Sequence, residues 1–149
     1  MTIEFLHEAP QYVAPAAALM RSLLSGPPCL EPYLDVLSHS LTPGRLPLAA
    51  VAVEDGEVIG AVGIFIADLL SRQDLRPWLA CLAVRKDRQG KGVGTALQAF
   101  ALDCCRLLGY ETVYLYTTLD GYYERTGWRY LCSGCEEDGS AVKIYSHAL

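Results

Sequence analysis

The chain has 149 residues, of which 52% are hydrophobic and 19% charged, and its formal net charge is −5. This composition is too apolar for a disordered chain, the length fits one domain over residues 1–149, and the acidic balance argues against a general nucleic-acid binder. The longest apolar runs, 46–53 and 58–70, are broken by Pro, Gly and Asp, so no membrane span is expected. The first eight residues carry acids and no basic segment before an apolar stretch, so we expect no secretory signal and a cytoplasmic location.

The N-terminal half alternates apolar segments with strong turn signals. We expect a short strand, a helix, a weaker helix and two further strands, over residues 3–6, 12–25, 32–41, 46–54 and 57–67. The first helix should end at Gly26-Pro27-Pro28, because this sequence cannot continue a helix. Asp55-Gly56 separates the last two strands and predicts a tight hairpin.

The C-terminal half predicts a strand, a helix, a strand, a short helix and a final hairpin, over residues 78–84, 93–108, 112–117, 120–126, 128–135 and 141–147. The strand at 78–84 (WLACLAV) is apolar throughout, as expected if both of its faces are covered. A strand–helix–strand unit is a right-handed crossover, so the strands at 78–84 and 112–117 should lie parallel and adjacent. We therefore predict an α/β fold with a mixed, mostly antiparallel sheet of about seven strands and helices on both faces.

The segment most informative about function is Gln89-Gly-Lys-Gly-Val-Gly94, which joins this apolar strand to the amphipathic helix. Its glycines allow a tight turn and a close approach of ligand to backbone. Free N–H groups at the start of the helix, together with the helix dipole, favour an anion such as a diphosphate. Lys91 and Arg88 could add positive charge at the rim of such a site.

The residues alone leave three interpretations of this segment open. The glycines could serve only a sharp turn between strand and helix, with the nearby basic residues forming a solvated surface. A dinucleotide-binding loop would need G-x-G-x-x-G directly after the strand, whereas the spacing here is G-x-G-x-G. A nucleotide triphosphate loop would need G-x-x-x-x-G-K-[ST], which the sequence lacks.

The same segment resembles the acetyl-CoA loop of the GNAT superfamily of N-acetyltransferases, whose pattern is [Q/R]-x-x-G-x-[G/A]. Gln89, Gly92 and Gly94 occupy the defined positions of that pattern. Downstream, Tyr122-Tyr-Glu-Arg-Thr-Gly-Trp128 is similar to the family's F-Y-E-K-L-G-F segment. The resemblance covers about residues 46–130. It implies transfer of an acetyl group from acetyl-CoA, by direct attack, to a primary amine of a small molecule or peptide, without a metal.

The resemblance also implies roles for individual residues. Tyr123 matches the tyrosine that protonates the departing thiolate of CoA in many members. The parallel strands would splay apart, so that backbone groups of Leu82, Ala83 and Val84 pair with the acetyl and pantetheine amides. The pyrophosphate would be held by the N–H groups of Gln89, Gly90, Lys91, Gly92, Val93, Gly94 and Thr95. Many members have an Asn one turn before the tyrosine; this chain has a shorter connection after Tyr116, which leaves the contacts of that loop open.

The sequence leaves the proton acceptor for the amine open among several acids that border the expected acceptor groove: Glu31, Asp35, Glu57, Asp68 and Asp74. Cys81 lies in the middle of a predicted strand. It could be a nucleophile that accepts the acyl group, or a small buried residue that packs in the core. We expect all six cysteines to be reduced thiols, and no metal site, since Cys132-Ser-Gly-Cys135 has no second pair.

Acceptor specificity should come from residues 12–41, the loop 68–77 and the turn 136–139. The acidic sequence Glu136-Glu137-Asp138 could attract a cationic amine or simply form a soluble turn. The alternative to an enzyme is a non-catalytic module that binds acetyl-CoA as a sensor. The sequence leaves a homodimer open.

Overall fold

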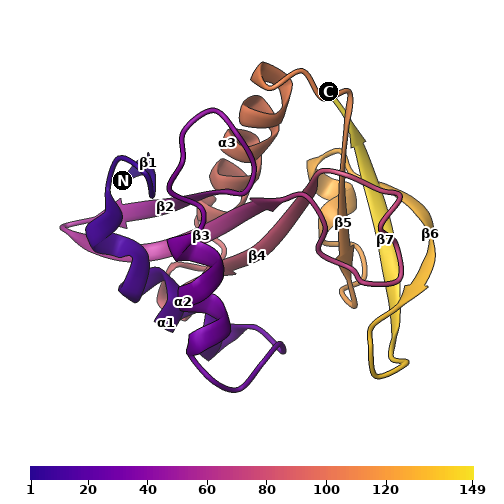
Figure 1. Ribbon diagram of the computed structural model, residues 1–149, viewed down its shortest axis with the longest axis horizontal. Coiled ribbons are helices and arrows are strands. Elements are labelled where there is room, and N and C mark those ends of the chain that lie inside the picture. Colours follow the sequence, from indigo (N-terminus) through magenta and orange to yellow (C-terminus); the bar gives the residue numbers. More distant parts are fainter.

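The computed structural model describes residues 1–149 and contains one seven-stranded sheet with the order β1-β2-β3-β4-β5-β7-β6 (Figure 1). The strands are β1 Thr2–Phe5, β2 Leu48–Glu54, β3 Glu57–Phe65, β4 Trp78–Val84, β5 Thr112–Thr117, β6 Arg129–Cys135 and β7 Ala141–Ala148. The helices are α1 Val13–Leu23, α2 Glu31–Ser38 and α3 Val93–Leu107. Neighbouring strands are antiparallel except β4 and β5, which are parallel. The predicted mixed sheet is confirmed.

Helices cover both faces of the sheet, as predicted, with α1 and α2 on one side and α3 on the other (Figure 1). Alternate residues of β2 supply the two cores: Ala50 and Ala52 pack in the cluster that contains α3, whereas Ala49 and Val51 pack with α1 and α2. Small side chains on both faces of β2 let both helix layers approach the sheet closely. No helix of the structure combines the length and the apolar character that a membrane span requires.

Several element boundaries differ from the prediction. The helix expected over 12–25 is α1 Val13–Leu23, preceded by a 3₁₀ turn at Pro10–Tyr12, and the weaker helix is α2 Glu31–Ser38. The short helix expected over 120–126 is only a 3₁₀ turn at Tyr123–Thr126. The reason is Gly121, whose φ of 73° is left-handed and interrupts a helix that would begin at Asp120.

The feature that shapes the functional face is the separation of β4 from β5. The two strands form one bridge, Trp78 to Tyr114, and then diverge, as the splayed arrangement predicted. On its other edge β4 stays paired with β3 through Val84, with a register shift next to Cys81. Cys81 has a φ of 53°, so β4 carries a bulge at this point. The β5-facing edge of β4 beyond Trp78 is therefore left without a strand partner.

A buried hydrogen-bond network attaches the Tyr123–Thr126 turn to α3. Gln98, which is only 2% exposed, accepts hydrogen bonds from Trp128 Nε1 at 3.0 Å and Thr126 Oγ1 at 2.8 Å. Trp128 in turn contacts the ring of Tyr123, with ring centroids 6.1 Å apart. The position of Tyr123 thus depends on one amide oxygen of α3.

We predict that Gln98→Met destabilises the fold by about 1–2 kcal/mol, because Trp128 Nε1 loses its buried acceptor and Thr126 Oγ1 keeps only the carbonyl oxygen of Tyr123. The unpartnered Gln98 Nε2 disappears in the same substitution, which offsets part of the loss. Urea unfolding measures the effect. Ala99→Met, on the exposed face of the same helix, is the control and should stay within about 0.5 kcal/mol of the parent. Equal stability of both variants would contradict the role of the network.

Candidate functional site

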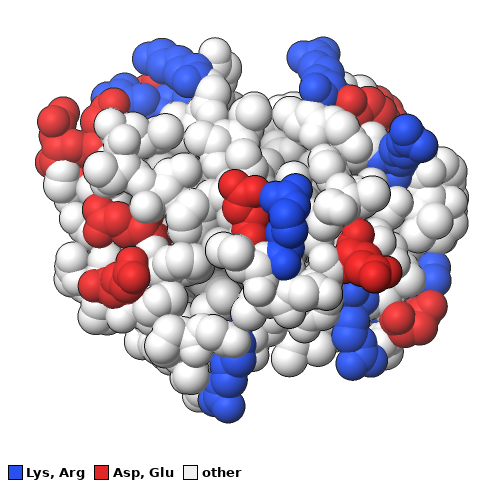
Figure 2. Space-filling model, turned by 90° about the horizontal axis from the view of Figure 1, so that it is seen from above, with Lys and Arg blue, Asp and Glu red and all other residues white.

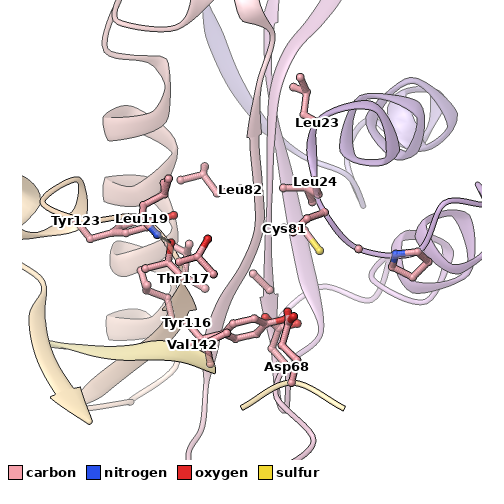
Figure 3. A pocket seen from close by; sticks show the side chains of 18 of the residues that line it. Leu23, Leu24, Asp68, Cys81, Leu82, Tyr116, Thr117, Leu119, Tyr123 and Val142 are labelled. Atoms are coloured by element: carbon pink, nitrogen blue, oxygen red, sulfur yellow. Dashed lines mark hydrogen bonds between the residues drawn. The ribbon is translucent and has the colours of Figure 1, made fainter. Parts of the chain in front are cut away.

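Two adjoining pockets open where β4 and β5 separate. The first, here called the loop pocket, has a volume of about 580 Å³ and lies between the end of β4 and the glycine segment before α3. The second, here called the acid pocket, has a volume of about 450 Å³ and includes Asp68 and Glu136 (Figure 3). The two pockets share five lining residues: Leu23, Leu24, Leu82, Leu119 and Tyr123. They are therefore two parts of one continuous site.

The glycines of the loop pocket serve two different purposes. Gly90 and Gly92 have left-handed φ values of 72° and 84°, and a Cβ built on either would meet no atom within 4 Å. Backbone conformation therefore requires these two glycines, and the space beside them is open to a ligand. Gly94 leaves room for the Tyr122 side chain, since a Cβ on Gly94 would lie 2.8 Å from the hydroxyl oxygen of Tyr122 and displace it.

The N-terminus of α3 supplies hydrogen-bond donors to this open space. Gly92 is the N-cap residue, and the first intrahelical bond runs from Ala96 N to Gly92 O. The N–H groups of Val93, Gly94 and Thr95 precede that bond, so no carbonyl of the helix accepts from them. These donors and the positive end of the helix dipole suit an anionic group such as a diphosphate.

The basic residues before α3 are largely neutralised by acids. Arg88, expected at the rim, instead bonds Glu54 at 2.8 Å and Asp87 at 3.0 Å, so that expectation was wrong. Arg85 bonds Asp87 as well, at 2.7 Å. Figure 2 shows basic and acidic side chains interspersed over the face seen from above. Among the basic residues only Lys86 lines the loop pocket, and Lys91 is exposed outside its lining.

The end of β4 forms the wall opposite the glycine segment. Leu82, Ala83 and Val84 all line the loop pocket, as does Gln89. The side-chain Nε2 of Gln89 donates to the carbonyl oxygen of Val84 at 3.0 Å, which ties the segment to the strand. Val84 O therefore already accepts a hydrogen bond within the protein.

Tyr123 lies at the junction of the two pockets. Its side chain is 9% exposed, and its ring packs edge-on against Tyr122, with centroids 4.8 Å apart. Burial first, and the neighbouring Tyr122 second, raise the pKa of the Tyr123 hydroxyl. Its hydroxyl therefore stays protonated at neutral pH and can act as a proton donor.

The short connection before Tyr123 is held by local contacts. Leu119 N donates to Thr117 Oγ1 at 3.0 Å, and Asp120 forms an ion pair with Lys143 of β7. Thr117, Thr118 and Leu119 line the acid pocket. Asp120 is therefore paired with Lys143, while Thr117 and Thr118 border the acid pocket.

Besides Tyr123, five titratable side chains from five separate parts of the chain line the acid pocket: Tyr33, Asp68, Cys81, Tyr116 and Glu136. Burial, and to a lesser extent the charge of Glu136, raises the pKa of Asp68 to about 7. Sequence reasoning had no signal for the two tyrosines, because one lies within a helix and the other within a strand, where core packing explains an aromatic residue equally well.

Ion pairs and pocket lining distinguish among the five acids that the sequence offered as proton acceptors for the amine. Glu57 pairs with Arg85 at 3.0 Å and Asp74 with Arg72 at 2.9 Å. Asp68 is the one of the five proposed acids that lines either pocket.

The structure leaves the cysteines as free thiols, and no group of three or more His, Cys, Asp or Glu side chains is arranged to hold a metal. Burial, and then the nearby Asp68, raises the pKa of Cys81 to about 12. A thiol with this pKa stays protonated at neutral pH and is a poor nucleophile. The geometry thus favours the interpretation of Cys81 as a buried residue of the bulge.

Comparison with known proteins identifies the family. Residues 17–128 match the model of the acetyltransferase (GNAT) family. The chain is 29% identical over 123 residues to N-alpha-acetyltransferase 30 of Schizosaccharomyces pombe, which covers 79% of this chain and 78% of that protein.

Solved structures share the fold. An aminoglycoside 6'-N-acetyltransferase complexed with coenzyme A has a TM-score of 0.76 at 17% identity, over 99% of this chain and 97% of that one. Ard1 from Thermoplasma volcanium has a TM-score of 0.75 at 17% identity, over 100% and 99% of the two chains. At these identities the likeness supports the fold alone.

Acetyl-CoA suits the loop pocket, which combines open space beside Gly90 and Gly92, the N-terminus of α3 and the unpaired edge of β4. Because the family model covers well over half of the chain, this protein belongs to the acetyltransferase (GNAT) family and is an acetyl-CoA-dependent N-acetyltransferase.

Proposed function

We propose that the protein acetylates a primary amine of a small molecule or peptide, with acetyl-CoA in the loop pocket and the amine in the acid pocket. The single observation that carries this proposal is the junction of the two pockets, where Tyr123 and Leu82 each line both of them. An acyl group held there would be reached by an amine from the acid pocket. The names of the relatives, an N-alpha-acetyltransferase and an aminoglycoside N-acetyltransferase, agree with a nitrogen acceptor.

In this proposal the backbone of the protein holds acetyl-CoA, which supplies the acetyl group in activated form as a thioester. Leu82 offers backbone groups on the unpaired edge of β4, in the manner of a strand pairing with its neighbour, and Ala83, which pairs with Ala61 of β3, lines the pocket beside it. The N–H groups from Gly90 to Thr95 bind the diphosphate, with Lys86 as the adjacent cation, while Gln89 N–H donates to Lys86 O at 3.4 Å and supports the turn. Val84 contributes through its packing and N–H, since Gln89 occupies its carbonyl oxygen.

Each part of the chemistry has a proposed source. A backbone N–H of β4 polarises the acyl carbonyl, and the two pockets hold the reactants in contact. As the amine nitrogen bonds to the carbonyl carbon and the C–S bond breaks, Tyr123 donates its phenolic proton to the sulfur. The ammonium group loses one proton toward solvent before it attacks, and the nitrogen loses a second as the amide forms. The Tyr123 oxygen then regains a proton from solvent.

A non-catalytic acetyl-CoA sensor is the second candidate. The acid pocket favours the enzyme, because a sensor does not need a second pocket that meets the first at Tyr123. Calorimetric titration with acetyl-CoA, followed by thiol release across an amine library read by mass spectrometry, separates the two. Binding together with release for at least one amine is expected; binding without release for every amine would leave the sensor.

The cytoplasm remains our proposed location. Six free thiols in one chain suit a reducing compartment, where they would stay reduced. We also propose that residues 1–149 act as one catalytic domain, since one sheet carries both pockets.

We predict that Gly92→Glu abolishes acetyl-CoA binding, because it places a carboxylate where the diphosphate is expected. Gly92→Ala is the matched control: it bears the same left-handed strain, about 1–2 kcal/mol, without the charge. Calorimetry should detect binding to the alanine variant and none to the glutamate variant, with both variants folded by circular dichroism. Equal affinity of the two variants would contradict the assignment of this segment.

We predict that Tyr123→Phe lowers kcat about 10²-fold while acetyl-CoA affinity stays nearly unchanged, because the proton donor is lost and the ring is kept. Tyr110→Phe removes a hydroxyl outside both pockets and should leave kcat unchanged. Thiol release under saturating acetyl-CoA gives kcat. An unaltered kcat in Tyr123→Phe would remove this residue from the mechanism.

A further inference from the structure

The acid pocket has two chemically different ends. Figure 3 shows Tyr123, Leu119 and Thr117 on one side and Asp68, with the ring of Tyr116 directed toward it, on the other. Most of the remaining lining is apolar: Leu23, Leu24, Leu79, Ala80, Leu82, Leu115 and Val142. An occupant whose amine reacts beside Tyr123 would thus extend along apolar walls toward the carboxylates.

The acidic end is built from two loops that the structure fastens together. Asp68 follows β3, and Glu136 follows β6. Ser71 Oγ donates to Cys135 O at 2.9 Å, which joins the two loops next to these acids. No Lys, Arg or His lines the acid pocket, so nothing within it neutralises Asp68 and Glu136.

A second feature points to a ligand in the same pocket. Tyr33 lines it, is 4% exposed, and its hydroxyl has no hydrogen-bond partner. A buried hydroxyl without a partner costs about 1–3 kcal/mol, so a polar group of an occupant is expected to complete it. The uncompensated acids and the unpartnered hydroxyl belong to one pocket, which makes this a built site for a polar cation.

We propose that the acceptor carries a second cationic group, which Asp68 and Glu136 bind while the amine to be acetylated lies at the junction beside Tyr123. The inference rests on the proposed acetyl transfer and names its substrate class: a small aliphatic α,ω-diamine. The apolar walls suit the chain between the two nitrogens. A volume of about 450 Å³ is within the usual range for small-molecule sites.

The ionisation of Asp68 adds a pH dependence. The titratable groups that face it are Glu136, Tyr116 and Cys81, and Tyr33 lines the same pocket. Burial, with a smaller contribution from Glu136, raises the pKa of Asp68 to about 7, so the carboxyl is charged above this pH and neutral below it. Attraction of a second cation should therefore increase as pH rises through about 7.

Three probes with the same reacting amine and a similar chain length test the substrate class: 1,5-diaminopentane, pentylamine and 5-aminopentanoate. Their far ends are cationic, neutral and anionic. At pH 8, kcat/KM should be at least about tenfold higher for the diamine than for pentylamine, and lowest for the amino acid, since a charged hydrogen bond contributes this much. Equal values for the diamine and pentylamine would overturn the proposal.

Asp68→Asn provides the matched variant. It should reduce kcat/KM for the diamine toward that of pentylamine, mainly through KM, while Glu136 preserves part of the preference. The loss should be much larger for the diamine than for pentylamine. The variant removes a charge that burial disfavours, so at pH 8 it should be at least as stable as the parent. An equal loss with all three probes would indicate a structural role and contradict the proposal.

The ratio of kcat/KM for the diamine to that for pentylamine cancels the ionisation of the reacting amine. This ratio should rise through about pH 7 in the parent. In Glu136→Gln the rise should move to lower pH, because removing the neighbouring negative charge lowers the pKa of Asp68. A ratio independent of pH would contradict the role of Asp68.

The outcomes separate this inference from the proposed function. Acetylation of library amines without preference for the diamine rejects only the second cation, whereas no acetylation of any amine rejects acetyl transfer itself. In that case calorimetric binding of 1,5-diaminopentane to the CoA complex, weaker in Asp68→Asn, still supports the acid pocket, and equal binding rejects it.

Discussion

The separation of β4 from β5 is the constraint on which the rest of the site depends. One bridge, at Trp78, holds the strands together before the bulge at Cys81 directs β4 away. Buried backbone N–H and C=O groups need hydrogen-bond partners, so a strand edge opened inside a sheet requires a ligand or water to complete it. Because both pockets lie in this opening, the same divergence accommodates the two substrates and brings them together at Tyr123.

Anion binding in this protein relies on the backbone more than on net positive charge. Arg85 and Arg88, which in the sequence look like a cationic cluster, are held by Glu54, Glu57 and Asp87. What remains is a set of N–H groups at the start of α3, oriented by two left-handed glycines. Such donors need no rearrangement when an anion arrives, and they favour a diphosphate without making the surface broadly basic. This is consistent with an acidic chain that binds a highly anionic co-substrate.

The sequence predicted what local patterns encode. Apolar periodicity and the Asp-Gly and Gly-Pro turns located the strands and helices, and one crossover rule placed β4 parallel to β5. Local patterns in the sequence could not predict contacts between residues that are far apart in the chain. The ion pair of Arg88 was hidden because Glu54 lies far away in sequence, and no local pattern indicated that Tyr33 and Tyr116 share a pocket. The acid pocket is assembled from segments far apart in the chain, from α1 to β7, so only the tertiary structure reveals it.

The most direct test of the account is amide hydrogen exchange over β4 and the glycine segment, with and without acetyl-CoA. If backbone groups hold the co-substrate, saturating acetyl-CoA should slow exchange at residues 82–84 and 89–95, and leave the edge strand β1 unchanged. Tight binding of acetyl-CoA with unchanged exchange in both segments would contradict the account, because the co-substrate would then lie elsewhere on the protein.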